Sequence, residues 1–134
     1  MNLKKLYKKI PSGKAAIKML EEIVWHGQPI CPYCKSKNFT PVKDSDRYHC
    51  NTCNTSYTVT VDTVFHKTKI PLQKWFYIIY LKETNGLNIP LRTLGEEIGI
   101  TKDTANRIVN KVNNFYFKNK DLFNSIYTKI SKNE

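Results

Sequence analysis

The chain has 134 residues, enough for one domain or two very small modules. It carries 22 Lys and Arg residues against 11 Asp and Glu, which gives a formal net charge of +11. This charge favours nucleic acid over a membrane as partner, because no basic helix pattern has a strongly apolar opposite face. The alternative explanation is that the charge serves solubility alone.

The N-terminal segment, residues 1–29, is expected to be helical. Ser12 is a suitable N-cap for a helix that reaches about Trp25. The next segment, residues 30–62, combines turn-forming residues with short runs that are typical of strands. One such run is 57–61, where apolar residues alternate with threonines, and this alternation predicts a half-buried strand.

The remaining segment, residues 63–134, is expected to be mainly helical. Pro71 precedes a strongly apolar run that predicts a helix over about 72–83. Because Trp75 and Phe76 lie in the densest part of this run, both are expected to be largely buried. Further helices are expected over about 91–98, 102–114 and 121–130.

Four cysteines form two Cys-x-x-Cys pairs, Cys31 with Cys34 and Cys50 with Cys53. Two intervening residues allow a tight turn to direct both sulfurs of a pair at one ion, and a short hairpin brings the second pair opposite. The sequence therefore predicts one structural Zn²⁺ ion in a zinc ribbon. The alternative is two reduced or redox-active pairs, but a thioredoxin-like motif needs one pair inside a βαβ unit, and that context is absent. His49 is interpreted as a strand residue, because four cysteines already fill the shell.

The grouping of the cysteines, without a secretion signal, argues for a reducing compartment. No stretch approaches the roughly 20 apolar residues of a membrane span. The N-terminus has basic residues but no apolar run behind them, so no signal peptide is visible. An intracellular protein, in the cytoplasm or nucleoid, is expected.

Residues 91–110 follow the sequence pattern of a helix-turn-helix. Gly95 is small where two helices must approach, Gly99 suits the turn, and Thr101 can cap the second helix. An ordinary helical hairpin is the alternative. The side chains left exposed on the second helix are of types that contact bases and phosphates. These candidate DNA-binding residues are Lys102, Asn106, Arg107, Asn110 and Lys111.

Three runs together resemble the transposase zinc-ribbon family of insertion sequences. They are Cys31-Pro32-Tyr33-Cys34, then Tyr48-His49-Cys50-Asn51-Thr52-Cys53, then the run from Thr63 to Phe76, which is the most specific. Residues 94–105 are similar to the helix-turn-helix of that family, so the resemblance covers about Ala15–Val112. It implies a zinc ribbon, a helix-turn-helix and DNA binding.

Two departures from the family pattern bear on function. Lys35 stands where the family usually has glycine after the second cysteine. The family continues into a nuclease domain with an acidic triad, whereas only 22 residues follow Val112 here. Two-metal phosphoryl transfer needs converging carboxylates in a substantial fold. The resemblance therefore implies zinc and DNA binding but not catalysis.

The predicted fold is α+β, with a small four-cysteine zinc ribbon flanked by helices and followed by a helix-turn-helix. The predicted function is non-catalytic binding of double-stranded DNA, by a stand-alone transcription regulator derived from a transposase or by a truncated transposase. A transcription or transposition complex is the expected wider partner. The alternative is a zinc-ribbon adaptor that docks on a protein machine such as RNA polymerase.

Overall fold

The computed structural model describes residues 2–132, in which helices combine with a small antiparallel sheet, as predicted. The chain forms two compact units. One is Lys14–Lys69, and the other joins the two ends of the chain, Met1–Gly13 and Ile70–Glu134. The three-segment division at 29/30 and 62/63 stays a prediction from the sequence. No helix within the described residues is long and apolar enough to cross a membrane.

The unit Lys14–Lys69 contains all but the first residue of helix α2 (Gly13–Trp25) and a three-stranded antiparallel sheet in the order β1-β2-β3. Its strands are short: β1 is Phe39–Pro41, β2 is Tyr48–Cys50 and β3 is Ser56–Tyr57. A turn joins β1 to β2, closed by a hydrogen bond from the Val42 N–H to the Arg47 carbonyl at 3.0 Å. This sheet places the second cysteine pair at the end of β2.

Aromatic and polar contacts fix α2 against the sheet. The Trp25 ring meets the rings of Tyr48 and Tyr57 edge-on, with centroids 5.7 Å away in each case. The Tyr48 hydroxyl donates a hydrogen bond to Glu21 at 2.8 Å. Burial is the main cause that raises the pKa of Glu21, and burial followed by the Glu21 contact raises the pKa of Tyr48 to about 12.

The strand predicted over residues 57–61 is wrong beyond its first residue, because β3 ends at Tyr57. The chain then makes successive turns, in which the Val61 N–H bonds the Thr58 carbonyl and the Thr63 N–H bonds the Thr60 carbonyl. Threonine hydroxyls add local bonds of the same kind, such as Thr63 Oγ1 to the Thr60 carbonyl at 2.6 Å. These side chains compete with the strand ladder for the backbone.

In the other unit, α1 (Leu3–Lys9) packs on α3 (Leu72–Asn85). The Asn2 side chain caps α1 by accepting the Lys5 N–H at 2.8 Å. The Lys9 ammonium donates to the carbonyls of Ile130 and Lys132 at the C-terminus of α6 (Lys120–Ser131). A cation is favourable there because the helix dipole leaves the last carbonyls partly negative.

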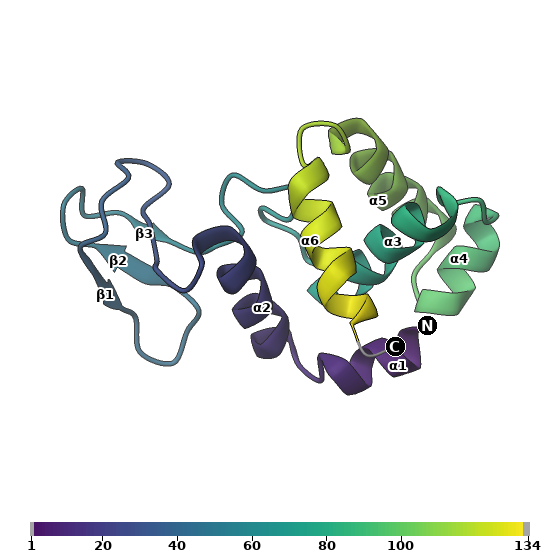
Figure 1. Ribbon diagram of the computed structural model, residues 1–134, viewed down its shortest axis with the longest axis horizontal. Helices are drawn as coiled ribbons and strands as arrows, with labels where there is room; N and C mark the ends of the chain where they lie inside the picture. Colours follow the sequence, from purple (N-terminus) through teal and green to yellow (C-terminus); the bar gives the residue numbers. More distant parts are fainter. Residues whose placement is uncertain (1, 133–134) are drawn as a thin grey trace. The chain divides into compact units, whose positions relative to one another are not determined.

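Helix α3 is the central element of this unit, and α6 lies alongside it (Figure 1). Trp75 and Phe76 are buried, which confirms the expectation from the apolar run. Gln73 is also buried and donates through Nε2 to the Ile10 carbonyl at 3.4 Å. The helix ends at Gly86, whose left-handed conformation (φ 68°) satisfies the last carbonyls.

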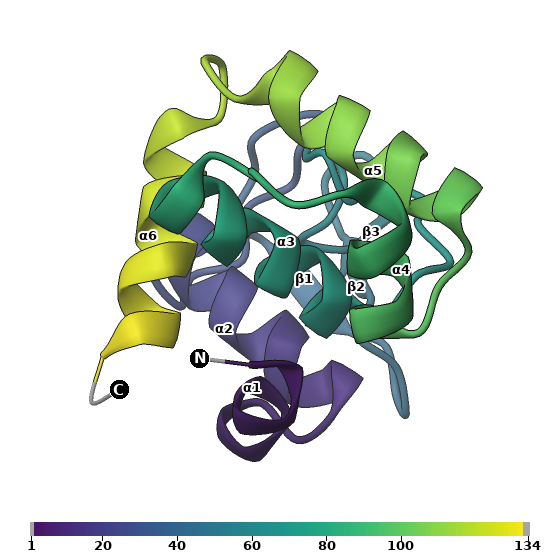
Figure 2. The same cartoon turned by 90° about the vertical axis from the view of Figure 1, so that its right-hand side faces the viewer.

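Helices α4 (Leu91–Ile98) and α5 (Lys102–Phe115) pack against one another beside α3 (Figure 2). Gly99 makes the turn between them with φ 75°. A Cβ at Gly95 would lie 2.7 Å from the Ile100 carbonyl oxygen, so only glycine allows this approach. The Thr101 hydroxyl caps α5 by accepting the Thr104 N–H at 3.1 Å. The sequence predicted all three features.

Candidate metal centre and nucleic-acid interface

Two nearly identical turns present the cysteine pairs. In the first, the Lys35 N–H bonds the Cys31 carbonyl at 2.9 Å and the Cys31 N–H bonds the Ser36 carbonyl at 3.0 Å. In the second, Asn54 and Thr55 make the same two bonds with Cys50, both at 2.8 Å. Each turn therefore directs both of its sulfurs to the same side.

The residue that follows the second cysteine of each pair has a left-handed backbone conformation, with φ 64° at Lys35 and φ 60° at Asn54. Asparagine tolerates this conformation better than lysine does, and glycine adopts it without strain. The family's usual glycine at the position of Lys35 therefore has a conformational reason. The positive φ at Lys35 therefore strains this turn more than a glycine at the same position would.

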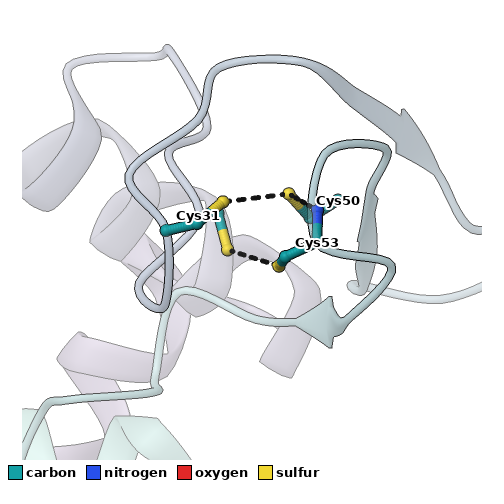
Figure 3. A group of neighbouring side chains, drawn as sticks. Cys31, Cys50 and Cys53 are labelled. Carbon is teal, nitrogen blue, oxygen red and sulfur yellow. Dashed lines mark hydrogen bonds between the residues drawn. The ribbon is translucent and has the colours of Figure 1, made fainter.

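The four sulfurs converge on one point (Figure 3). All four lie within 4.8 Å of one another, with Cys31 Sγ 3.7 Å from Cys53 Sγ and Cys34 Sγ 3.5 Å from Cys50 Sγ. These separations exceed the roughly 2.05 Å of a disulfide. Zinc–sulfur bonds of about 2.3 Å in a tetrahedron place the sulfurs about 3.8 Å apart, so the geometry fits Zn²⁺.

Two of the clustered thiols differ in acidity because their surroundings differ. The Cys53 N–H is the largest influence on Cys50, and it lowers the pKa of that thiol to about 6 although desolvation opposes it. The Ser36 N–H also lowers the pKa of Cys34, but desolvation and the neighbouring sulfurs outweigh it and raise the value to about 12. A bound divalent ion would hold all four thiols as thiolates, because metal ligands must be deprotonated.

The zinc centre is structural in character. A Cys₄ set fills the tetrahedron and leaves no position for water or substrate. Cys31 and Cys50 are fully buried, and the buried ring of Tyr57 lies on the strand that follows the second turn. Burial, followed by the negative charge of Cys31, raises the pKa of Tyr57 to about 12. His49 is not part of the described metal-ligand cluster.

The exposed face of α5 holds the residues predicted to contact DNA. All five are exposed there: Lys102, Asn106, Arg107, Asn110 and Lys111. The opposite face, formed by Ala105, Ile108 and Val112, is buried. Asp103 is also exposed, in the first turn of the helix. The predicted amphipathic pattern of this helix is therefore present.

Hydrogen bonds within this face are long and local. The Arg107 guanidinium lies 3.4 Å from the Thr104 hydroxyl, and the Asn110 amide lies 3.5 Å from the Asn106 amide oxygen. Both contacts join residues one turn apart on the same helix. Their weakness leaves the guanidinium and amide groups available to a ligand.

The aromatic run at the end of α5 was not among the residues predicted to be functional. The structure leaves Phe115 and Phe117 exposed there, and Phe117 has 85% of its surface accessible. A signal was present in the sequence. Phe117 follows Asn106, Asn110 and Asn113 at helical spacing, so it falls on the polar side of the pattern where an aromatic residue is unexpected.

Together these features define a protein with a four-cysteine zinc ribbon and a pair of tightly joined helices. Comparison with known proteins agrees. Residues 11–56 match a family described as a transposase zinc-ribbon domain, which confirms the resemblance over that segment. An uncharacterized protein in transposable element ISH50 of Halobacterium salinarum is 28% identical over 103 residues. No solved structure shows a significant match.

That alignment covers 75% of this chain but 34% of the relative, so the chain spans about a third of the relative's length. The family match ends at residue 56, before α3, α4 and α5. Residues 11–56 are therefore similar to a transposase zinc-ribbon domain, and the four clustered cysteines form the zinc-binding site.

Proposed function

We propose that this chain binds double-stranded DNA through α5, as the DNA-binding part of a transposition system. The observation that carries the proposal is the exposed face of α5, with five cationic or amide side chains opposite a buried apolar face. The similarity to a protein of a transposable element supports transposition, rather than transcription, as the setting.

The turn between α4 and α5 supports a role of the pair as a helix-turn-helix. Gly95 and Gly99 bring the two helices together, and Lys74 of α3 donates to the Gly99 carbonyl at 3.4 Å. A rigidly held second helix is what insertion into a major groove requires. We therefore assign α5 the part of the recognition helix.

The side chains of α5 divide by the contacts that their chemistry allows. Asn106 and Arg107 lie about one turn past the cap, where adenine and guanine edges come within reach of such groups. Lys102, Asn110 and Lys111 are assigned mainly to phosphates and to the edges of the groove. Asp103 can accept a hydrogen bond from a cytosine amino group.

We assign no catalytic step to this chain. Among the described residues, the four cysteines are the one group able to hold a metal ion. The two-metal chemistry of strand transfer uses converging carboxylates. The chain is proposed to locate DNA, and the carboxylates for strand transfer would have to come from elsewhere.

Selection of bound duplexes from a random library, followed by a salt series, tests the proposal. Arg107→Ala is expected to cost about 1–3 kcal/mol on the selected site and to relax its sequence preference. Lys102→Ala should weaken all duplexes similarly and reduce the salt slope by about one unit. Lys18→Ala, an exposed lysine of α2, is the charge-matched control and should have little effect.

Either of two results would contradict the proposed function. The parent protein would show no DNA affinity at low salt, or Arg107→Ala and Lys102→Ala would bind like the parent. Retention of a protein partner without any duplex, at high salt, would instead support the adaptor alternative. The three results differ, so one series distinguishes the two functions.

A further inference from the structure

The corner between α5 and α6 presents aromatic rings to solvent. Phe117 is 85% exposed and Phe115 is 41% exposed. Large aromatic side chains are normally buried, because each removes about 150–250 Å² from water. Two of them exposed within three residues, at the end of the proposed recognition helix, indicate an interaction surface.

Tyr116 holds this corner in a defined conformation. Its ring lies 6.1 Å from the ring of the buried Phe123 of α6, and Lys82 of α3 lies over it at 5.1 Å from the centroid. Desolvation, followed by the hydrogen bond from its hydroxyl to Glu83, raises the pKa of Tyr116. Phe117 meets the anchored Tyr116 ring edge-on at 5.7 Å. The exposed Phe117 ring therefore packs against a Tyr116 side chain that is itself held in place.

The charge of this region favours a polyanion. From residue 104 to residue 120 the sequence has no Asp or Glu, while it has four basic residues. Five asparagines lie in the same stretch. The basic residues are Arg107, Lys111, Lys118 and Lys120. Aromatic rings interspersed with cations are the combination that binds single-stranded nucleic acid, through stacking and backbone attraction.

The length of α5 determines which part of the DNA Phe117 can contact. Asn106, Asn110 and Asn113 lie on one face of the helix, and Tyr116 keeps helical backbone angles, so Phe117 continues that face. At about 1.5 Å per residue, Phe117 lies about 16 Å along the axis from Asn106. Recognition helices contact base edges through their N-terminal residues, so with Asn106 among the bases Phe117 lies past the base-contacting part of α5.

An aromatic ring at this end of the helix cannot stack on a paired base, because paired bases are already stacked inside the duplex. We propose that Phe117 stacks on unpaired bases of a DNA strand that leaves the duplex beside the α5 site. The substrate class is thus duplex DNA with an adjoining single-stranded segment. This inference rests on the proposed function for the duplex part of the site.

A second copy of the chain fits the exposed corner between α5 and α6 less well than a nucleic-acid strand does. A stable interface buries about 800 Å² per partner, whereas the exposed apolar surface here comes from two phenylalanines. Two copies that met at this corner would also bring two acid-free basic segments together. Both considerations favour a nucleic-acid strand.

The test compares three labelled DNAs by fluorescence anisotropy: the selected blunt duplex, the same duplex with a single-stranded extension of about 6 nucleotides, and the extension alone. The extension is expected to raise the affinity of the parent at least about 5-fold. Phe117→Leu keeps the apolar bulk but removes the aromatic face, so it should lose this gain and keep blunt-duplex binding. Phe117→Trp should retain the gain. Arg107→Ala should weaken both duplexes and leave their ratio unchanged.

The outcomes separate this inference from the proposed function. Equal binding of blunt and extended duplexes by the parent, or an unchanged gain in Phe117→Leu, overturns the inference and leaves the proposed function standing. Failure to bind any duplex, with single-strand binding that depends on Phe117, overturns the proposed function and supports the stacking site. A change in molecular mass of Phe117→Leu in sedimentation would show that a second copy occupies the corner, and the inference would fall.

Discussion

Lys35 and Asn54 hold equivalent positions in the two zinc-binding turns, and both adopt a left-handed backbone conformation. The positive φ allows the following residues, Ser36 and Thr55, to bond back to the first cysteine of each pair. Both turns therefore depend on a conformation that most residues adopt only at an energetic cost. Lys35 is the less suited of the two residues.

Lys35→Gly is expected to stabilise the protein by about 0.5–1 kcal/mol, because removal of left-handed strain outweighs the added freedom of the unfolded chain. Thermal unfolding of the zinc-loaded protein measures this effect. Lys37→Gly is the matched control, since Lys37 is an exposed lysine without positive φ in the same turn region, and it should be neutral or destabilising. Equal effects of the two changes would contradict the strain argument.

Purified protein is expected to contain about one zinc ion per chain by elemental analysis. Cys53→Ser should lose most of that zinc and lower the unfolding temperature, because the binding energy of the site is also folding energy. Acidification should release zinc from the parent as protons compete for the thiolates. Thr52→Ser keeps the hydroxyl that bonds Ser36 at 2.8 Å and should retain the metal. Folded protein that contains no zinc would refute the assignment.

The helix pair α4–α5 depends on one close approach between elements. The Cβ of an alanine at position 95 would lie 2.7 Å from the Ile100 carbonyl oxygen, a backbone atom that cannot rotate away. Gly95→Ala is therefore expected to destabilise the protein by about 1–3 kcal/mol in chemical denaturation, despite the better helix propensity of alanine. Gly13→Ala meets nothing within 4 Å and should be neutral or stabilising. Equal changes in stability for Gly95→Ala and Gly13→Ala would contradict the close approach at Gly95.

Helix α3 connects the elements of its unit through side chains buried on nearly every face. Trp75 retains 2% of its surface, so Trp75→Ala is expected to cost about 3–5 kcal/mol. Chemical denaturation followed by far-ultraviolet circular dichroism gives the value. Phe117→Ala, a truncation of an exposed aromatic residue in the same unit, should change stability by less than about 0.5 kcal/mol. A small loss of stability in Trp75→Ala would show that the surrounding side chains collapse into the cavity left by the ring.

Charge acts at the scale of the whole molecule. The excess of 22 basic over 11 acidic residues attracts DNA of any sequence, whereas the few side chains on α5 are proposed to supply preference. We expect purified protein to leave supercoiled and linear DNA uncut in Mg²⁺ or Mn²⁺, as judged on agarose gels. Cleavage that persists through purification and disappears when one carboxylate is replaced would contradict this expectation.

Several features were predictable because their causes are local in the sequence. Two cysteines separated by two residues define a turn, and two such turns define a Cys₄ site. Gly86 and Gly99 terminate helices at the predicted positions, since left-handed caps favour glycine. The predicted bounds of α4 and the predicted start of α5 also agree with the structure, where Gly99 ends α4 and the Thr101 side chain caps α5.

Other features depended on partners distant in sequence. Helix α1 has seven residues, a length that is marginal in isolation, and contacts with α3 and with the end of α6 support it. Alternation over residues 57–61 predicted a strand, but no ladder partner extends beyond Tyr57 and local threonine bonds form instead. Strand pattern alone does not specify whether a neighbouring strand is present.

The sequence by itself determined the four zinc ligands, the apolar helix and the amphipathic pattern of α5, because spacing and periodicity act over a few residues. Only the tertiary structure decided that both chain ends join in one unit and that the sulfurs converge to within 4.8 Å. It also decided that Tyr116 is anchored while Phe117 is left exposed. Burial depends on which distant segments cover a side chain, and no local pattern contains that information.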